Sequence, residues 1–177
     1  SRRLSNELKK QGFAVGRYKT RQVMGQLKLK VRYPKLYKST TDSNHNEAIS
    51  PNRLDRQFNV AKPNQVWTTD ITYIWTLQGW LYLAAVLDLY SRRIVGWALC
   101  DHLRESLVFT ALHQAIGERQ PRAGLIHHTD RGGQYAGQAY RRVLQRAGMR
   151  QSMSCADNVY DNAFMESCFG TIKTELE

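Results

Sequence analysis

Apolar residues recur at helical spacing in two short stretches of the otherwise polar first third of the chain. Residues 2–11 place Leu4 and Leu8 four positions apart among basic side chains, which predicts an amphipathic helix. Residues 17–27 predict a second helix after a glycine-containing turn. The residues expected to face inwards from this second helix are Val23, Met24 and Leu27. Two short helices joined in this way, the second of them basic, fit a helix-turn-helix module that reads DNA, but any two-helix hairpin gives a similar pattern.

Residues 33–62 predict a linker, because prolines and small polar residues are frequent there and apolar residues are sparse. Near its end an apolar pattern returns at Leu54, Phe58 and Val60. We expect these three residues to lie along the surface of the domain that follows.

The pattern changes to β-strands at Val66, where β-branched and aromatic residues become frequent. Strands are expected over 66–76, 80–87, 94–99, 125–128 and 150–153, and helices over 104–119, 136–147 and 162–177. Short connections make the first three strands antiparallel neighbours. The order β-β-β-α-β-α-β-α predicts an α/β fold, a mixed sheet with helices packed on its faces.

Composition agrees with a folded protein of one full domain and a smaller one, since the chain has 177 residues of which 42% are hydrophobic. The longest uncharged apolar run, residues 80–87, is too short to span a membrane, and the N-terminus lacks the apolar core of a signal peptide. The three cysteines have no metal-binding spacing and are typical of reduced cytosolic thiols. A cytoplasmic protein is therefore expected.

The positive charge is concentrated in the first 62 residues. They hold fifteen Lys and Arg against four Asp and Glu, so the whole formal net charge of +11 lies there and the remaining residues are balanced. This asymmetry predicts an arm that binds a polyanion, joined to a neutral body. The alternative is a basic extension that only aids solubility. The expected DNA contacts in this arm are Arg17, Lys19, Arg21 and Gln22.

Three acidic residues occupy positions that suit phosphodiester chemistry. Asp70 lies within the first predicted strand, and Asp130 follows the fourth strand at a Gly132-Gly133 turn. If the first strand pairs with the fourth, both carboxylates meet at one edge of the sheet. Glu166, on the last predicted helix, comes 35 residues after Asp130. Three carboxylates are ligands that Mg²⁺ prefers, and two such ions can support an in-line displacement at phosphorus.

The last helix is expected to pack through the stripe Met165, Phe169, Ile172 and Leu176. Glu166 and Lys173 lie on an adjacent line, roughly 10 Å apart along the axis, which is too far for a salt bridge. Lys173 is therefore free to meet a phosphate close to Glu166.

Other side chains leave more than one interpretation open. Asp70 could instead be a structural carboxylate, buried in its strand and satisfied by hydrogen bonds, although an unpaired charge among apolar residues is costly. His127 and His128 fit equally a supporting role at the site and a structural one. The aromatic residues of the first two strands are interpreted as packing in the core and on the sheet faces, not as platforms for bases: Trp67, Tyr73, Trp75, Trp80 and Tyr82.

Residues 64–177 resemble the integrase-type catalytic core of bacterial insertion-sequence transposases, in the group often called IS-three, specifically the product of their second reading frame. Residues 1–32 resemble the helix-turn-helix that precedes this core, without its start. The matching segments are Asn64-Gln65-Val66-Trp67, Asp70-Ile71-Thr72-Tyr73, Leu87-Asp88-Leu89-Tyr90-Ser91-Arg92-Arg93-Ile94-Val95-Gly96-Trp97, His128-Thr129-Asp130-Arg131-Gly132-Gly133-Gln134-Tyr135, Tyr160-Asp161-Asn162-Ala163, Glu166-Ser167 and Lys173.

The resemblance implies a ribonuclease H-like fold with a catalytic, metal-binding triad of Asp70, Asp130 and Glu166. It also implies two Mg²⁺ ions per site, with Mn²⁺ as a substitute, nicking of the element's 3′ end by water, and strand transfer by the freed 3′-OH. Element ends and target DNA are the expected partners, with a homo-multimer for synapsis. The expected DNA contacts in the core are Lys173, Arg131 and Asn162.

The implied domains are a partial helix-turn-helix over 1–32, a basic linker over 33–62 and an integrase-like core over 63–177. Members of this group continue past the glutamate helix with further helices, so the core is expected to be truncated at its C-terminus. Two alternatives to an active transposase remain. One is a nuclease of the same fold, and the other is a truncated, non-catalytic DNA-binding remnant.

Overall fold

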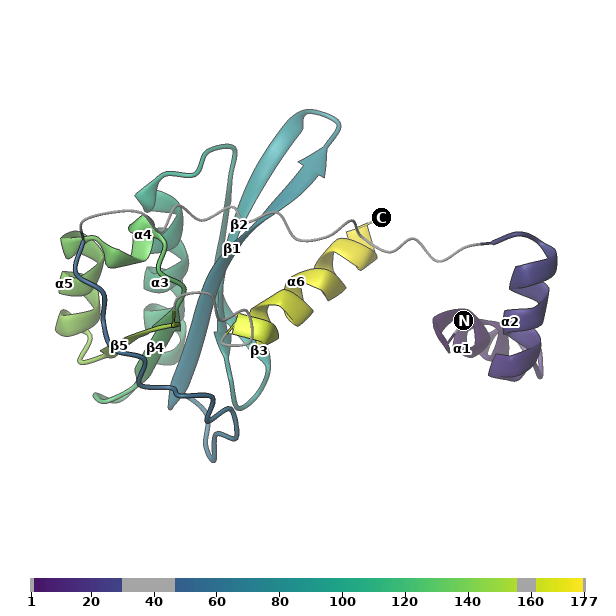
Figure 1. The fold of residues 1–177 in the computed structure, drawn as a ribbon, viewed down its shortest axis with the longest axis horizontal. Coiled ribbons are helices and arrows are strands. Elements are labelled where there is room, and N and C mark those ends of the chain that lie inside the picture. Colours follow the sequence, from purple (N-terminus) through teal and green to yellow (C-terminus); the bar gives the residue numbers. More distant parts are fainter. Residues whose placement is uncertain (1, 30–46, 156–161, 177) are drawn as a thin grey trace. The chain divides into compact units, whose positions relative to one another are not determined.

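The computed structural model describes residues 2–29, 47–155 and 162–176 (Figure 1). The chain forms two compact units, residues 1–39 and 40–177, and the division between them falls within the predicted linker 33–62. The first unit contains α1 (Arg2–Lys10) and α2 (Arg17–Gln26), which confirms the two predicted helices. No helix in the described ranges is both long and apolar enough to cross a membrane.

The prediction that three residues of this second helix face inwards was partly wrong. Val23 and Leu27 are 38% and 64% exposed, and Met24 is half-buried. A hydrogen bond from the Ser5 hydroxyl to the Val15 carbonyl oxygen joins α1 to the segment before α2. Two short helices provide too little surface to cover a full apolar stripe on each other, and this leaves α2 largely exposed.

The second unit is built on one five-stranded sheet in the order β3-β2-β1-β4-β5. Its strands are β1 (Val66–Thr76), β2 (Gly79–Asp88), β3 (Arg93–Cys100), β4 (Ile126–Thr129) and β5 (Arg150–Met153). The first three strands pair antiparallel, whereas β4 pairs parallel with both β1 and β5. The predicted mixed sheet is therefore confirmed, with each strand within two residues of its expected bounds.

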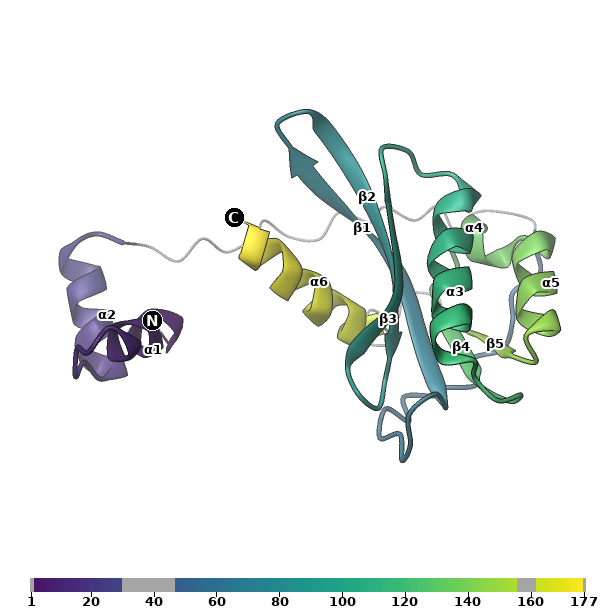
Figure 2. The same ribbon diagram turned by 180° about the vertical axis from the view of Figure 1, so that it is seen from behind.

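Helices cover both faces of the sheet (Figures 1 and 2). On one face lie α3 (Glu105–Arg119), the short α4 (Gly133–Ala136) and α5 (Gln138–Arg146), whereas α6 (Ala163–Leu176) lies on the other. Trp67, Val86 and Leu112 share the core on the α3 side, and Leu83, Met165 and Phe169 share the core under α6. The sequence pattern did not predict α4, because four residues show no helical period.

The end of the predicted linker packs on the second unit, as expected. Leu54 is 3% exposed and shares an apolar cluster with Val66 and Leu89, with Phe58 and Val60 packed against it. The backbone N–H groups of residues 53 and 54 both donate to the Ser152 hydroxyl. Residues 33–46 of that linker lie outside the described residues.

The aromatic residues of β1 and β2 divide into two environments. Trp67 is fully buried in the core, whereas Trp75 and Trp80 are 64% and 53% exposed and lie on the surface of the sheet, in agreement with the predicted packing in the core and on the sheet faces. They pack edge to face on each other with ring centroids 4.9 Å apart. β4 pairs only with the first four residues of β1, so the far end of the β1–β2 hairpin projects beyond the rest of the sheet and its helices (Figure 1).

Helix α3 packs closely against Gly96 on β3. A Cβ atom at this position would clash with the Ala111 carbonyl oxygen and lie 2.7 Å from the Cβ of Ala115. Both contacts belong to well-buried atoms of α3, which cannot move aside as the end of a flexible side chain could. The absence of a side chain at residue 96 therefore sets the distance between α3 and the sheet.

We expect Gly96→Ala to destabilise the protein by about 1–3 kcal/mol, since the added methyl overpacks a closed helix–sheet contact. Urea unfolding followed by circular dichroism measures the change. The matched control is Gly117→Ala on α3, where a Cβ meets nothing within 4 Å. This control should be neutral or stabilise by up to about 1 kcal/mol, since alanine favours helix. Equal midpoints for Gly96→Ala and wild type would contradict the close approach.

Candidate active site

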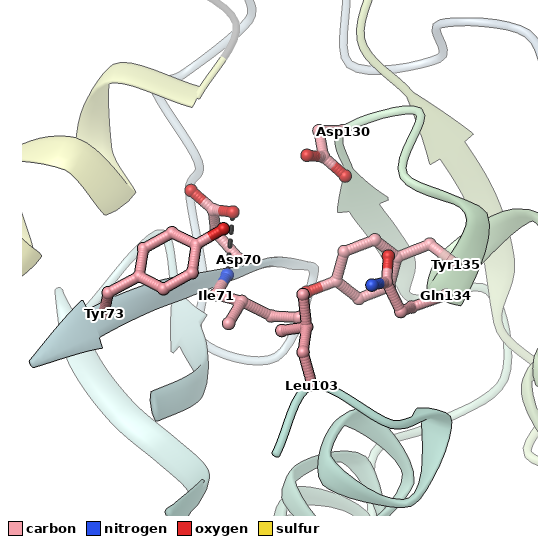
Figure 3. Close-up of a pocket in the computed structure, with 7 residues that line it drawn as sticks. All are labelled: Asp70, Ile71, Tyr73, Leu103, Asp130, Gln134 and Tyr135. Atoms are coloured by element: carbon pink, nitrogen blue, oxygen red, sulfur yellow. Dashed lines mark hydrogen bonds between the residues drawn. The ribbon is translucent and has the colours of Figure 1, made fainter. Parts of the chain in front are cut away.

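Asp70 and Asp130 lie next to each other because of the parallel pairing of β1 with β4. The register pairs Thr68 with His128 and Thr69 with Thr129, Asp70 is the next residue of β1, and Asp130 directly follows the end of β4. Parallel strands lie about 4.8 Å apart, and residues at the same step of the register project to the same face. Figure 3 shows the two carboxylates at one cavity. The predicted meeting of these residues at one edge of the sheet is thus what the structure contains.

Local hydrogen bonds hold both side chains. One carboxylate oxygen of Asp70 accepts from the Ile71 backbone N–H at 2.7 Å, and one of Asp130 accepts from the Gly132 N–H at 2.9 Å. The second bond closes the turn that leads from β4 into α4. It keeps the Asp130 carboxylate beside the end of its strand.

The surroundings of Asp70 disfavour its negative charge. Burial, followed by the nearby Asp130 carboxylate, raises the pKa of Asp70 to about 8, and Glu166 adds to this shift. The Ile71 hydrogen bond and the Lys173 ammonium act in the opposite direction but do not cancel it. The carboxylates of Asp130 and Glu166 therefore both lie within electrostatic reach of Asp70, with too little positive charge to balance them.

Glu166 and Lys173 come from α6, on the face of the sheet towards which Asp70 projects. The buried residues of α6 are Met165 and Phe169, which confirms the first half of the predicted stripe, and Ile172 is half-buried, while Leu176 is 64% exposed. Glu166 and Lys173 are exposed beside this stripe. Both act on the charge of Asp70, which places them in its vicinity.

A small cavity lies at the edge of β1 beyond the end of β4 (Figure 3). Its volume is about 20 Å³, enough for one water-sized group. The lining residues are Asp70, Ile71, Tyr73, Leu103, Asp130, Gln134 and Tyr135. Sequence reasoning missed Leu103, Gln134 and Tyr135 as site residues. The position of Gln134-Tyr135 directly after the Gly132-Gly133 turn was the signal that could have found two of them.

Two further predicted DNA contacts have structural partners. The Arg131 Nε–H donates to the Ser154 carbonyl oxygen at 2.8 Å, which ties the turn after β4 to the end of β5. The Asn162 side-chain oxygen accepts from the Thr68 hydroxyl at 2.9 Å, which ties the start of α6 to β1. Both side chains are half-buried. Their roles in DNA binding stay predictions.

The remaining predicted DNA contacts, Arg17, Lys19, Arg21 and Gln22, are all exposed on α2. They belong to the first compact unit and not to the unit that holds the carboxylates. Their surface is accessible to a polyanion.

His127 and His128 are both fully buried and make structural contacts. The Nε2 atom of His127 lies 2.8 Å from the Tyr140 hydroxyl oxygen, and burial lowers the pKa of His127 to about 3, so its ring is neutral. The Nδ1 atom of His128 lies 2.9 Å from the Ser152 hydroxyl oxygen. Of the two interpretations left open, these contacts favour the structural one, in which the histidines fasten β4 to α5 and β5.

Carboxylate oxygens from Asp70 and Asp130 could together bind a hard divalent cation. The chemistry of the donors fits such an ion, because the crowded negative charge around Asp70 is what a cation would neutralise. Within the described ranges, however, no three His, Cys, Asp or Glu side chains are close enough together to hold one ion. The two aspartates thus form the centre of the candidate site, with Glu166 close enough on α6 to act on the charge of Asp70.

Comparison with known proteins gives the family. The integrase core domain model matches residues 60–158, a range that includes both aspartates and ends before Glu166. An uncharacterized 31 kDa protein of insertion element IS600 from Shigella sonnei is 43% identical over 175 residues, covering 99% of this chain and 64% of the relative. Transposase InsF of insertion sequence IS3A from Escherichia coli is 37% identical over 173 residues, covering 98% of this chain and 60% of the relative.

The fold is that of a known solved structure. The HTLV-2 integrase catalytic core domain in complex with magnesium, in its dimeric form, superposes with a TM-score of 0.53 at 20% identity, covering 63% of this chain and 69% of that one. This likeness shows a ribonuclease H-like fold. The chain spans about 60% of the length of the curated relatives described above.

With the family match over more than half of its residues and a sheet that carries the two aspartates side by side, the chain belongs to the integrase core domain family and resembles the IS3-type insertion-sequence transposases within it.

Proposed function

We propose that this chain is part of a DNA transposase that hydrolyses a phosphodiester at the element's 3′ end and then joins the freed 3′-OH to another DNA. The observation that carries this proposal is the placement of Asp70 beside Asp130 by the parallel register of β1 and β4. The similarity to transposase InsF supports DNA as the substrate. Both steps are displacements at phosphorus, so one site can perform them with water or a 3′-OH as the nucleophile.

Asp70 and Asp130 would hold Mg²⁺, and Glu166 is assigned to the same site as the third carboxylate. When bound, divalent ions polarise the scissile phosphate and stabilise the attacking and leaving oxygens, for which two ions are proposed. The magnesium complex of the HTLV-2 core supports the choice of ion. The chain itself contributes the acidic pair, the turn that orients Asp130, and the Lys173 ammonium near Asp70, which is suited to a DNA phosphate.

The basic first unit is proposed to supply most of the DNA affinity. Its exposed residues Arg17, Lys19, Arg21 and Gln22 share one helix, and the first 62 residues carry the whole excess of positive charge. Arg131 and Asn162 are proposed as DNA contacts near the carboxylates. A homo-multimer is proposed for the pairing of two DNA ends, supported by the dimeric form of the HTLV-2 core.

Nicking of supercoiled plasmid in Mg²⁺ or Mn²⁺ tests the chemistry without knowledge of the element's ends. We expect nicking by the wild type and a loss of at least about a hundredfold in Asp130→Asn, since a neutral amide is a far poorer cation ligand than a carboxylate. The control is Asp101→Asn, an exposed acid outside the site, which should nick like the wild type.

DNA affinity should be retained in Asp130→Asn, because the substitution leaves the basic arm unchanged. Loss of nicking together with loss of DNA binding would count against a catalytic role for this residue. A strand-transfer assay with DNA that carries a free 3′-OH separates the transposase from a nuclease of the same fold, which would cut without joining strands.

Metal binding should be visible in thermal stability. In EDTA above pH 8 we expect Asp70→Asn to unfold at a higher temperature than the wild type. The reason is that a carboxyl whose folded pKa lies above its unfolded one destabilises the fold as pH rises from about 4 to about 8. In Mg²⁺ the wild type should gain stability, by about 2.7 kcal/mol at a hundred times the dissociation constant, and the variant much less.

Differential scanning fluorimetry in EDTA and in millimolar Mg²⁺ measures both effects, with Asp101→Asn as the charge-matched control. Equal gains from Mg²⁺ in wild type and Asp70→Asn would show that the ion binds elsewhere.

The role of the basic arm should appear in the salt dependence of DNA binding. Replacing Arg17, Lys19 and Arg21 together by Gln should weaken binding and flatten the slope of log affinity against log salt by roughly 0.9 for each phosphate that the variant no longer neutralises. Fluorescence anisotropy with a labelled duplex measures it. A triple Gln variant at Arg122, Arg142 and Arg146, exposed in the second unit, removes the same charge and should change the slope less. Equal slopes for the two variants would contradict a dedicated arm.

A further inference from the structure

Tyr135 presents a buried hydroxyl to the cavity between the two aspartates without any hydrogen-bond partner. The residue is 1% exposed, and its hydroxyl oxygen has no partner in the part of the chain that the structure describes. Its side chain points from α4 into the cavity that Asp70 and Asp130 also line (Figure 3). Leaving a buried hydroxyl unsatisfied costs about 1–3 kcal/mol, so such a group in a native structure needs a ligand or another explanation.

The neighbouring tyrosine shows that this arrangement is specific to Tyr135. Tyr140 is equally buried, its ring lies edge to face against that of Tyr135 with centroids 5.4 Å apart, and it comes from the next helix. Its hydroxyl, however, is 2.8 Å from the Nε2 atom of His127 and lies on the α5 side of the sheet. Of these two buried tyrosines in contact, Tyr135 lines the cavity and has an unpaired hydroxyl, whereas Tyr140 does neither.

The hydroxyl of Tyr135 is held in place and stays protonated. Gln151 donates its side-chain N–H to the Tyr135 carbonyl oxygen at 2.8 Å, which fixes the backbone of α4 to β5. Burial, together with the charges of Asp70 and Asp130, raises the pKa of this phenol well above its ordinary value. A hydroxyl that remains protonated beside two carboxylates can act only as a neutral group that donates one hydrogen bond and accepts others.

The cavity limits what the hydroxyl can meet. A volume of about 20 Å³ admits one oxygen-sized group, and the Gln134 amide lines the same space. In the proposed function, on which this inference rests, two oxygens come near the aspartates: a non-bridging oxygen of the scissile phosphate and the attacking water. Both accept a hydrogen bond from a phenol.

We propose that the Tyr135 hydroxyl is a substrate-contacting group, which donates a hydrogen bond to the oxygen that enters the cavity between Asp70 and Asp130 during DNA cleavage. The hydroxyl supplies a fixed donor in a cavity whose charged lining residues, Asp70 and Asp130, are both acidic. On a phosphate oxygen this bond stabilises the negative charge that develops as the phosphodiester is displaced, and on the attacking water it orients the oxygen, in either case with no reorientation at the moment of reaction.

The test compares Tyr135→Phe with its matched control Tyr140→Phe in plasmid nicking. Tyr135→Phe should lower kcat about tenfold at unchanged KM, since a donor to developing charge acts in the transition state. Its Tm should be equal to that of the wild type or higher, because the lost hydroxyl had no partner. Tyr140→Phe should show the reverse, a lower Tm with unchanged kcat measured below its unfolding transition.

Sulfur substitution identifies which oxygen is the acceptor. The substrate is a linear duplex with sulfur at one non-bridging position of each phosphodiester, cleaved in Mn²⁺. If the acceptor is a phosphate oxygen, wild type and Tyr135→Phe should cleave this duplex at equal rates, because sulfur accepts hydrogen bonds weakly. A water acceptor predicts that the tenfold difference remains. An unchanged kcat on the oxygen duplex, or a lowered Tm that accounts for the loss, overturns the proposal. No metal-dependent nicking by the wild type would contradict the proposed function itself, and the role of Tyr135 with it.

Discussion

The candidate site depends on the pairing of one very short strand. Four residues of β4 bind in parallel to the first four residues of β1, and this contact alone puts Asp70 level with Asp130. The strand is enclosed by the rest of the unit, since His127, His128 and Thr129 are each fully buried. His127 contacts α5 through Tyr140, and His128 contacts β5 through Ser152. A slip of one residue in this register would turn Asp130 to the opposite face from Asp70 and remove the site.

The same arrangement is costly for the fold in the absence of a cation. Asp70 is half-buried, and the carboxylates of Asp130 and Glu166 both act against its negative charge. Apolar packing on both faces of β1 and β2 keeps the carboxylates in place despite their repulsion, with Trp67 and Val86 on the α3 side and Leu83 and Met165 under α6. Strain of this kind, held by a rigid sheet, is common at sites that bind charged ligands.

Much of this architecture was predictable from sequence because its elements are long, periodic and joined by short connections. The three antiparallel strands, the buried half of the α6 stripe and the meeting of Asp70 with Asp130 all follow from local patterns. The predictions failed where the burial of a side chain depends on other elements of the fold. Val23 and Leu27 were expected to face inwards, but the described part of their unit contains no third helix to cover them. Tyr135 was missed because its helix has only four residues, and a tyrosine there is read as packing until the cavity is seen.

Helix α6 is held most firmly in its N-terminal half, where Met165 and Phe169 are buried. Asn162 is bonded to Thr68, and Phe164 lies edge to face on Phe58 and under the guanidinium of Arg92, whereas the far end at Leu176 is largely exposed. At about 1.5 Å per residue, Glu166 lies roughly 6 Å from Asn162 and Lys173 roughly 16 Å. A tilt of α6 about its N-terminal end would therefore displace Lys173 almost three times as far as Glu166, which would stay close to Asp70.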